Sequence, residues 1–169
     1  MRALRIGMST LAAGACGLAL LAGAGACETL GFDSDRDRLQ EARELWQDRG
    51  VGDYRLDVRR LCFCGYDVTR AVRVTVRSGV VVSRTYVDDG TVVGEAPGSF
   101  AGLPELFPDV EGLFAVVEDA LDRDADQLDV TYDAEFGVPL NIVIDYRRNT
   151  ADEELTFQAE AFTELPASG

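Results

Sequence analysis

Apolar residues recur at the three- and four-residue spacing of an amphipathic helix in two segments of this chain. The first segment begins near Asp33 and Asp35, whose carboxylates suit the free amides of a helix start, and it ends at Gly50. The second segment follows Pro108. The two apolar stripes consist of Leu39, Ala42, Leu45 and Trp46, and of Val110, Leu113, Phe114, Val117 and Leu121. Two helices, each with one buried face, are therefore predicted.

Each predicted helix is followed by three segments in which apolar and polar residues alternate, as they do in half-buried strands. The segments span about residues 54–60, 72–77, 80–87, 128–133, 140–146 and 153–162. Leu56-Asp57-Val58 in the first triplet recurs as Leu128-Asp129-Val130 in the second, which favours an internal duplication. The residues predicted to face inward are Tyr54, Leu56, Val58, Val72, Val74, Val76, Leu128, Val130, Tyr132, Leu140, Ile142, Ile144, Tyr146, Leu155, Phe157, Ala159 and Ala161.

Arg60 disturbs the alternation of the first strand, because it falls on the inward side with Leu56 and Val58. A charged residue at such a position predicts a bulge or a strand end near Arg59-Arg60. The segment between the third strand and about Gly102 is predicted to be a loop. The short turns within each triplet favour antiparallel pairing. We therefore predict an α+β fold in which one antiparallel sheet of about six strands, in α-βββ-α-βββ order, carries two helices packed on one face.

The N-terminus has the organisation of an export signal. Two arginines, Arg2 and Arg5, precede an uncharged run that closes on the small residues Ala24-Gly25-Ala26, directly before Cys27. A cysteine in this position resembles the lipobox of bacterial lipoproteins, in which the thiol is acylated and the chain is cut before it. We predict a signal peptide at 1–26, a lipid on Cys27, a tether at 27–34 and a single domain at 35–165.

Two other interpretations of this segment stay open. The same small residues fit the cleavage site of a plain secretory signal, and the apolar run is about as long as the ~20 residues of a membrane span. Cys16 also follows an Ala-Gly-Ala string, but the apolar run continues beyond this cysteine. We therefore expect Cys16 to be removed with the signal peptide. The predicted location is the bacterial cell envelope, anchored to a membrane by Cys27. Glu28 after the cysteine favours the outer membrane if the host has one.

The charge and the residue types narrow the range of functions. The formal net charge of −14 excludes a general affinity for nucleic acid and disfavours an anionic bilayer surface as a partner. All 16 basic residues are Arg, and the chain has no His and no Lys. Without an imidazole there is no Ser-His or Cys-His pair, and without Lys there is no Schiff base. We therefore expect that the protein is not an enzyme and that it binds no cofactor.

The charge is unevenly distributed along the chain. Residues 55–84 hold seven arginines against two aspartates, whereas residues 87–135 hold fourteen acidic residues against Arg123 alone. The two parts of the fold could attract one another, or the Arg-rich face could meet an acidic partner. Both interpretations stay open.

Cys62-Phe63-Cys64 is the most distinctive chemical motif of the predicted domain. In a strand the two Cα atoms would lie about 6.5 Å apart, near the upper limit for a disulfide, and a bend at Gly65 would shorten this distance. An intrachain bridge is the leading interpretation for an oxidising compartment. A thiol redox role, half of a zinc site, and free or intermolecular thiols are the alternatives.

Two acidic clusters are candidate sites. Asp122-x-Asp124-x-Asp126 has the spacing that opens a calcium loop, but Gln127 replaces the glycine expected at its sixth position. A solvated helix-to-strand turn is the simpler interpretation. The acids at Asp152, Glu153 and Glu154 could serve acid–base chemistry, although polar strand faces commonly place acids together. We expect no metal site.

A series of landmarks runs through the predicted domain: Trp46 and Tyr54, Arg60-Leu61-Cys62-Phe63-Cys64, Val74-Thr75-Val76-Arg77-Ser78-Gly79-Val80-Val81, Leu113-Phe114, Val130-Thr131-Tyr132-Asp133, Gly137-Val138-Pro139, Ile144-Asp145 and Asp152-Glu153. In this order they resemble the DUF6174 family, a group of bacterial secreted or lipoprotein-like domains of unknown function. The resemblance covers about residues 40–162. It implies a location and a domain type, and it implies no reaction.

Taken together, these features predict a lipid-anchored extracytoplasmic domain that binds another envelope protein and catalyses no reaction. The expected contact surfaces are the exposed sheet face and the Arg-rich hairpins. The alternative is a thiol–disulfide redox protein that uses Cys62 and Cys64. A calcium-dependent binding module is third.

Overall fold

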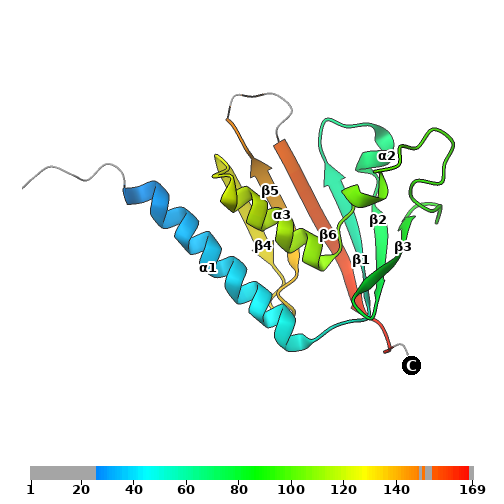
Figure 1. Cartoon of the computed structure of the whole chain (residues 1–169), viewed down its shortest axis with the longest axis horizontal. Coiled ribbons are helices and arrows are strands. Elements are labelled where there is room, and N and C mark those ends of the chain that lie inside the picture. The colour runs from blue at the N-terminus through cyan, green and yellow to red at the C-terminus, as the bar shows by residue number, and fades with distance from the viewer. Residues whose placement is uncertain (1–25, 149, 151–153, 168–169) are drawn as a thin grey trace, which may run out of the picture.

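The computed structural model describes residues 26–148, 150 and 154–167 (Figure 1), so the predicted signal lies outside the described residues except for Ala26. The elements in chain order are α1 (Ala26–Arg49), β1 (Tyr54–Leu61), α2 (Tyr66–Thr69), β2 (Val72–Arg77), β3 (Val80–Tyr86), the 3-10 turn η1 (Pro104–Leu106), α3 (Val110–Asp122), β4 (Gln127–Tyr132), β5 (Pro139–Asp145) and β6 (Glu154–Glu164). The predicted α+β class is confirmed.

The six strands form one antiparallel sheet, as predicted, and their order within it is β3-β2-β1-β6-β5-β4. Each triplet is a meander of neighbouring strands, and the two triplets join where β1 pairs with β6. The second half of this order repeats the first half side by side, with β4 in the place of β1. That arrangement agrees with a duplication in which the two Leu-Asp-Val segments correspond.

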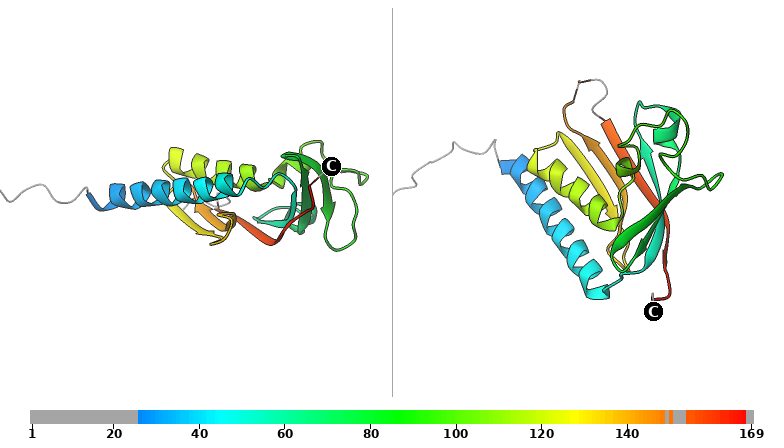
Figure 2. Two further views of the ribbon diagram at one scale, coloured as in Figure 1. Left: turned by 90° about the horizontal axis from the view of Figure 1, so that it is seen from below. Right: turned by 45° about the vertical axis from the view of Figure 1, so that its right-hand side comes forward.

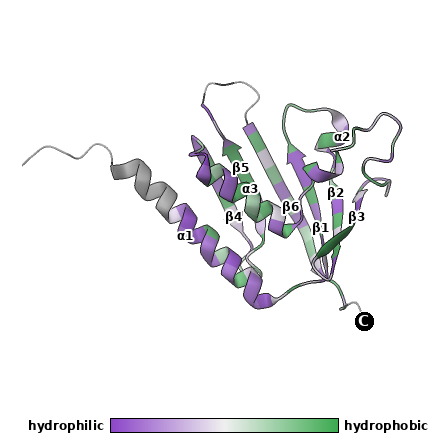
Figure 3. Cartoon of the chain, viewed as in Figure 1, coloured by the Kyte–Doolittle hydropathy of each residue, from purple (hydrophilic) through white to green (hydrophobic). Residues whose placement is uncertain are grey.

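Both long helices cover the same face of the sheet, as predicted. Figure 2 shows α1 and α3 side by side, with α3 over the sheet and α1 beyond it, near the β4 edge. The apolar stripe of α3 is completely buried, and the Asp109 carboxylate caps the helix by accepting a hydrogen bond from the amide of Gly112. Figure 3 shows how apolar and polar residues alternate along the strands.

Among the described residues, no helix is long and apolar enough to cross a membrane.

The connection between β3 and α3 belongs to the core. Val93, Leu103 and Phe107 are buried together with the inward residues of β1 and β2. The side chain of Arg84 fixes the connection to the sheet, because its Nε donates to the carbonyl of Phe107 at 2.8 Å. The segment predicted as a loop therefore contributes Val93 to the core, and the residues after it contribute Leu103 and Phe107.

Helix α1 begins at Ala26, upstream of the start predicted near Asp33. Residues 27–34, predicted as a tether, are thus helical. No proline interrupts this stretch, and its single glycine costs a helix only about 1 kcal/mol. Whether the segment joins the domain to a lipid stays a prediction.

An aromatic cluster holds α1 against the sheet. The ring of Trp46 makes edge contacts with Tyr54 and Phe162, at centroid distances of 5.3 and 5.9 Å, and Phe136 packs on Phe162 at 5.0 Å. The indole nitrogen of Trp46 also donates to the Glu111 carboxylate at 2.8 Å. The N-terminal end of α3 is joined to the C-terminal end of α1 by this bond.

Gly137 allows α1 to approach the β4–β5 turn closely. Its φ angle is +76°, a conformation that other residues rarely adopt. A Cβ atom at this position would lie 2.2 Å from the carbonyl oxygen of Ala42 in α1. Both the backbone conformation and the helix contact therefore require glycine here.

Two details of strand register refine the prediction. Of the two features expected near Arg59-Arg60, the strand end occurs, because β1 ends at Leu61, whereas the bulge does not, because β1 stays in register with β6 up to Leu61 and Arg60 points inward. The irregularity lies instead opposite Leu56, where Ala161 adopts a φ angle of +52°. This extra residue reverses the alternation, so that Ala161 is exposed and Phe162 turns toward the core.

Candidate binding surfaces

Cys62 and Cys64 lie at the tip of the molecule, directly after β1 ends. Their Sγ atoms are 1.95 Å apart and their Cα atoms 5.2 Å apart. The amide of Cys64 donates to the carbonyl of Cys62 at 2.8 Å, which makes a tight turn. The turn therefore brings the two Cα atoms closer than the ~6.5 Å spacing of an extended strand.

Apolar side chains are exposed around the disulfide. Phe63, between the two cysteines, is 94% exposed, and Tyr66 in α2 is 73% exposed. Leu61 at the end of β1 is also exposed. We call the set Leu61, Cys62, Phe63, Cys64 and Tyr66 the tip surface. Single exposed apolar residues are common on proteins, whereas several within six positions of the chain make this turn a candidate contact site.

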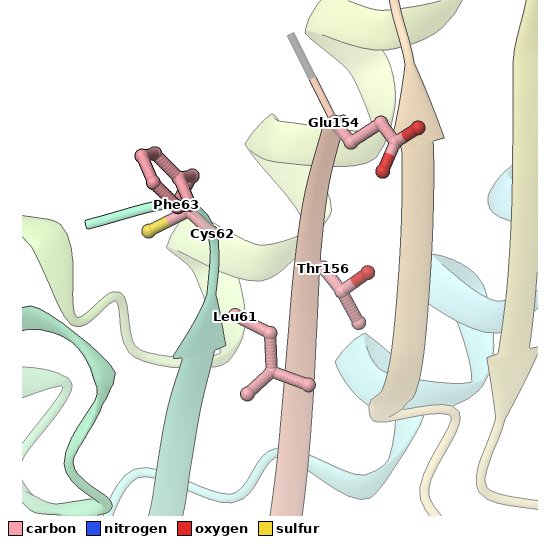
Figure 4. Close-up of a pocket in the computed structure, with 5 residues that line it drawn as sticks. All are labelled: Leu61, Cys62, Phe63, Glu154 and Thr156. Carbon is pink, nitrogen blue, oxygen red and sulfur yellow. The ribbon is translucent and has the colours of Figure 1, made fainter. Parts of the chain in front are cut away.

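A cavity of about 300 Å³ opens beside the tip surface (Figure 4). Leu61, Cys62 and Phe63 line one side, and Glu154 and Thr156 of β6 line the other. In Figure 4 Phe63 and Cys62 lie beyond the end of β1, next to the start of β6. The cavity could receive one apolar side chain of a partner.

The arginines of the β1–β3 region are mostly paired within the domain. Arg73 makes a bidentate ion pair with Asp57, with both distances at 2.8 Å, and this contact raises the pKa of the guanidinium. Arg70 pairs with Asp88 and Asp89 and lies over the ring of Tyr86. Arg77 pairs with Asp53, and Arg84 is held by the Phe107 carbonyl. The attraction expected between the basic and acidic segments therefore operates at Arg70.

Three arginines of this region, Arg55, Arg59 and Arg60, have neither an ion pair nor a side-chain hydrogen bond with any described residue, whereas Arg84 has its bond to Phe107. Arg55 and Arg59 are exposed on the sheet face opposite the helices. Arg59 also lines a shallow groove of about 340 Å³ together with Tyr66, and thus lies next to the tip surface. Its positive charge is available to a partner at that place.

Arg60 points to the other face of the sheet, into a groove of about 430 Å³ beneath α3. We call this site the Arg60 groove. Its guanidinium stacks on the ring of Phe157 at 5.6 Å, and its Nε is buried without a hydrogen-bond partner among the described residues. Burial lowers the pKa of Arg60. An unsatisfied buried donor costs about 1–3 kcal/mol, and more when it is charged.

The remaining polar groups of the Arg60 groove lie on α3, on η1 and after β5. The Tyr146 hydroxyl donates to the Asp119 carboxylate at 2.8 Å, and Arg123 covers the Tyr146 ring at 4.0 Å. Burial, followed by the bond to Asp119, raises the pKa of Tyr146 to about 12. Glu105 lies exposed at the rim. Asp119 is thus already partnered by Tyr146 and Arg123, whereas Arg60 is not.

The acidic run after α3 has structural partners. Asp122 pairs with Arg36 at 3.1 Å, and the Asp126 carboxylate accepts the amide of Arg148 at 2.7 Å. Within the described ranges, no group of three Cys, Asp or Glu side chains is arranged to hold a metal ion. Asp152 and Glu153 lie outside the described residues, and Glu154 lines the cavity at the tip.

The structure therefore brings Cys62 and Cys64 together at an exposed turn and places Cys27 in the first turn of α1. It also shows the Arg60 groove, which sequence reasoning missed. The signal was present in the sequence, because Arg60 occupies an inward position of a strand. An inward charge also fits a bulge or a strand end, so the alternation alone does not reveal the groove.

The fold defines the chain as a single α+β domain in which two helices cover one face of a six-stranded antiparallel sheet. The chain belongs to the DUF6174 family, a family of unknown function whose model matches residues 38–164. No curated protein and no solved structure matches the chain. Among the landmarks that suggested the family, Trp46, Tyr54 and Gly137 hold α1 on the sheet, so these three are explained by packing.

Proposed function

We propose that this protein is a bacterial cell-envelope domain, anchored by a lipid on Cys27, that binds another envelope protein through its tip surface and catalyses no reaction. The observation that carries the proposal is the exposure of Phe63, which is 94% accessible between two joined cysteines. A large aromatic side chain in this position contributes nothing to the core. It is available as the central anchor of an interface.

The disulfide supports this role because it limits the motion of the turn that carries Phe63. A binding residue that is already ordered loses less conformational entropy when a complex forms. The cavity between Phe63 and Thr156 adds a recess for an apolar side chain of the partner. A projecting ring beside a recess is a suitable arrangement for a specific contact.

Charge indicates which partner fits. Arg59 lies beside the tip surface and has no carboxylate partner within the described part of the domain. A partner with an acidic patch around an apolar residue would satisfy Arg59 and cover Phe63. The chain as a whole carries a net charge of −14, so this local positive charge would orient the approach of such a partner.

Site-specific photo-crosslinking in host cells tests the proposal. A photoreactive phenylalanine analogue at position 63 should give one discrete protein adduct, and the adduct should be lost in the Arg59→Glu variant. The matched control places the analogue at Val80, which is also exposed but lies at the opposite end of the β2–β3 hairpin. Equal adducts from both positions, an adduct that survives Arg59→Glu, or crosslinks to lipid alone would contradict the proposal.

A thiol–disulfide redox function is the second candidate, and it is favoured by the exposure of Cys64 at the tip. In such a reaction an external thiolate attacks one sulfur, and a second thiol then releases the reduced pair. Two electrons and two protons thereby pass from two thiols to Cys62 and Cys64. Equilibration with glutathione distinguishes the functions: a redox pair is half-reduced near the compartment's potential, whereas a structural bridge stays oxidised.

A further inference from the structure

The Arg60 groove lies on the helix-covered side of the sheet, away from the tip surface and the outward-facing Arg59. Arg60 reaches it from β1, Leu155 and Phe157 reach it from β6, and α3 forms its opposite wall. Its volume of about 430 Å³ falls within the range of about 300–1,000 Å³ that is usual for small-ligand sites.

The walls of the groove are mainly apolar. They come from Leu106, Pro108, Ala115, Val116, Leu155 and Phe157. Leu106, Val116 and Leu155 are partly buried and pack against the core, so they form a firm lining. An apolar lining with a few placed polar groups is the usual composition of a ligand site.

The positive charge in this groove is not satisfied by the protein. The Nε of Arg60 is buried without a hydrogen-bond partner, and Arg60 makes no ion pair with any described acidic residue. Its contact with Phe157 orients the guanidinium but leaves the donors of the fork unused. A carboxylate is the group that an arginine fork binds most directly.

We propose that the Arg60 groove binds a small anionic amphiphile, a carboxylate with an aliphatic chain, such as a free medium-chain fatty acid. The carboxylate pairs with Arg60, and the aliphatic chain lies between α3 and the Leu155–Phe157 segment of β6. Asp119 is engaged by Tyr146 and Arg123, and Glu105 stays at the exposed rim, so neither carboxylate occupies the place of the ligand's head group.

Titration calorimetry with octanoate tests this assignment. Octanoate should bind more tightly than octan-1-ol, which lacks the charge, and than acetate, which lacks the chain. Arg60→Gln should weaken octanoate binding about tenfold or more, the loss expected for a charge-assisted hydrogen bond. The matched control is Arg59→Gln, which removes the same charge from the adjacent residue on the opposite face and should leave the affinity within about twofold.

Two further measurements support the test. Ala115 is exposed and lines the groove, so Ala115→Trp should fill it and abolish octanoate binding while the core stays intact. In the unmodified protein, the NMR signal of the Arg60 Nε–H should shift when octanoate is added, and this readout needs no variant. Equal affinities of the two arginine variants, binding of acetate as tight as that of octanoate, or an unmoved Nε–H signal would each overturn the proposal.

Discussion

Gly137 offers the most sensitive test of how α1 is held on the sheet. We consider the replacement of Gly137 by Ala, which adds a single methyl group. The new Cβ would lie 2.2 Å from the carbonyl oxygen of Ala42 and 3.0 Å from its carbonyl carbon. Since both atoms belong to the backbone of α1, the clash is relieved only if the helix or the β4–β5 turn moves.

Two energies add to the expected effect. Holding a residue other than glycine at a φ angle of +76° costs about 1–2 kcal/mol. Forcing a methyl group into a packed contact costs a further ~1–3 kcal/mol. The free energy of unfolding should therefore fall by about 2–5 kcal/mol, a large part of the ~5–15 kcal/mol that is typical of a domain.

Gly79→Ala is the matched control, because Gly79 has a φ angle of +74° and a Cβ there would meet nothing within 4 Å. It therefore reports the backbone cost alone, about 1–2 kcal/mol. Urea unfolding followed by circular dichroism gives both values, provided that the m-values agree. Gly137→Ala should be the more destabilising variant by about 1–3 kcal/mol. Equal losses for the two variants would refute the close approach of α1 to Gly137.

Three other outcomes are expected. Arg60→Met should raise the free energy of unfolding by about 1 kcal/mol in urea titrations, because removing the unsatisfied Nε donor gains more stability than the lost stacking on Phe157 costs. A loss of stability would contradict this. Hydrogen bonds from Thr91, and then Arg70, lower the pKa of Asp89 from 3.8 to about 2, so its stabilisation is present above about pH 4 and lost as the pH falls through about 2. An NMR titration of the Asp89 carboxyl with a midpoint near 3.8 would disprove the lowered pKa. Replacing Cys62 and Cys64 by Ser should lower the free energy of unfolding by ~1.6 kcal/mol, which is the loop-closure entropy of a three-residue loop. An unchanged midpoint in urea unfolding would be the opposing result.

The periodic parts of the fold could be predicted from the sequence because one face of each element is buried. The stripe from Val110 to Leu121 predicts α3, and the alternation in Val72–Arg77 predicts β2. The pattern fails at Ala161, where the chain inserts one residue opposite Leu56. A bulge leaves the residue types of a strand unchanged and alters only their register, so composition carries no sign of it.

Core residues without periodicity could not be predicted. Leu103 and Phe107 are among the most deeply buried residues, yet they lie in an irregular connection whose path depends on the completed sheet. Arg60 is the opposite case, since its inward position was visible in the alternation. Whether Arg60 faces the groove depends on whether β1 continues to Leu61. Pairing with β6, which is distant in the sequence, decides that.

The central claim is a domain anchored by a lipid on Cys27 that has a Cys62–Cys64 disulfide. The most direct test is the intact mass of the protein extracted from host membranes, measured with and without thiol alkylation. The predicted result is an acylated chain that starts at Cys27, lacks two hydrogens and has no alkylatable thiol. A chain that retains residues 1–26, carries no acyl group and alkylates at Cys62 and Cys64 would contradict both the anchor and the bridge.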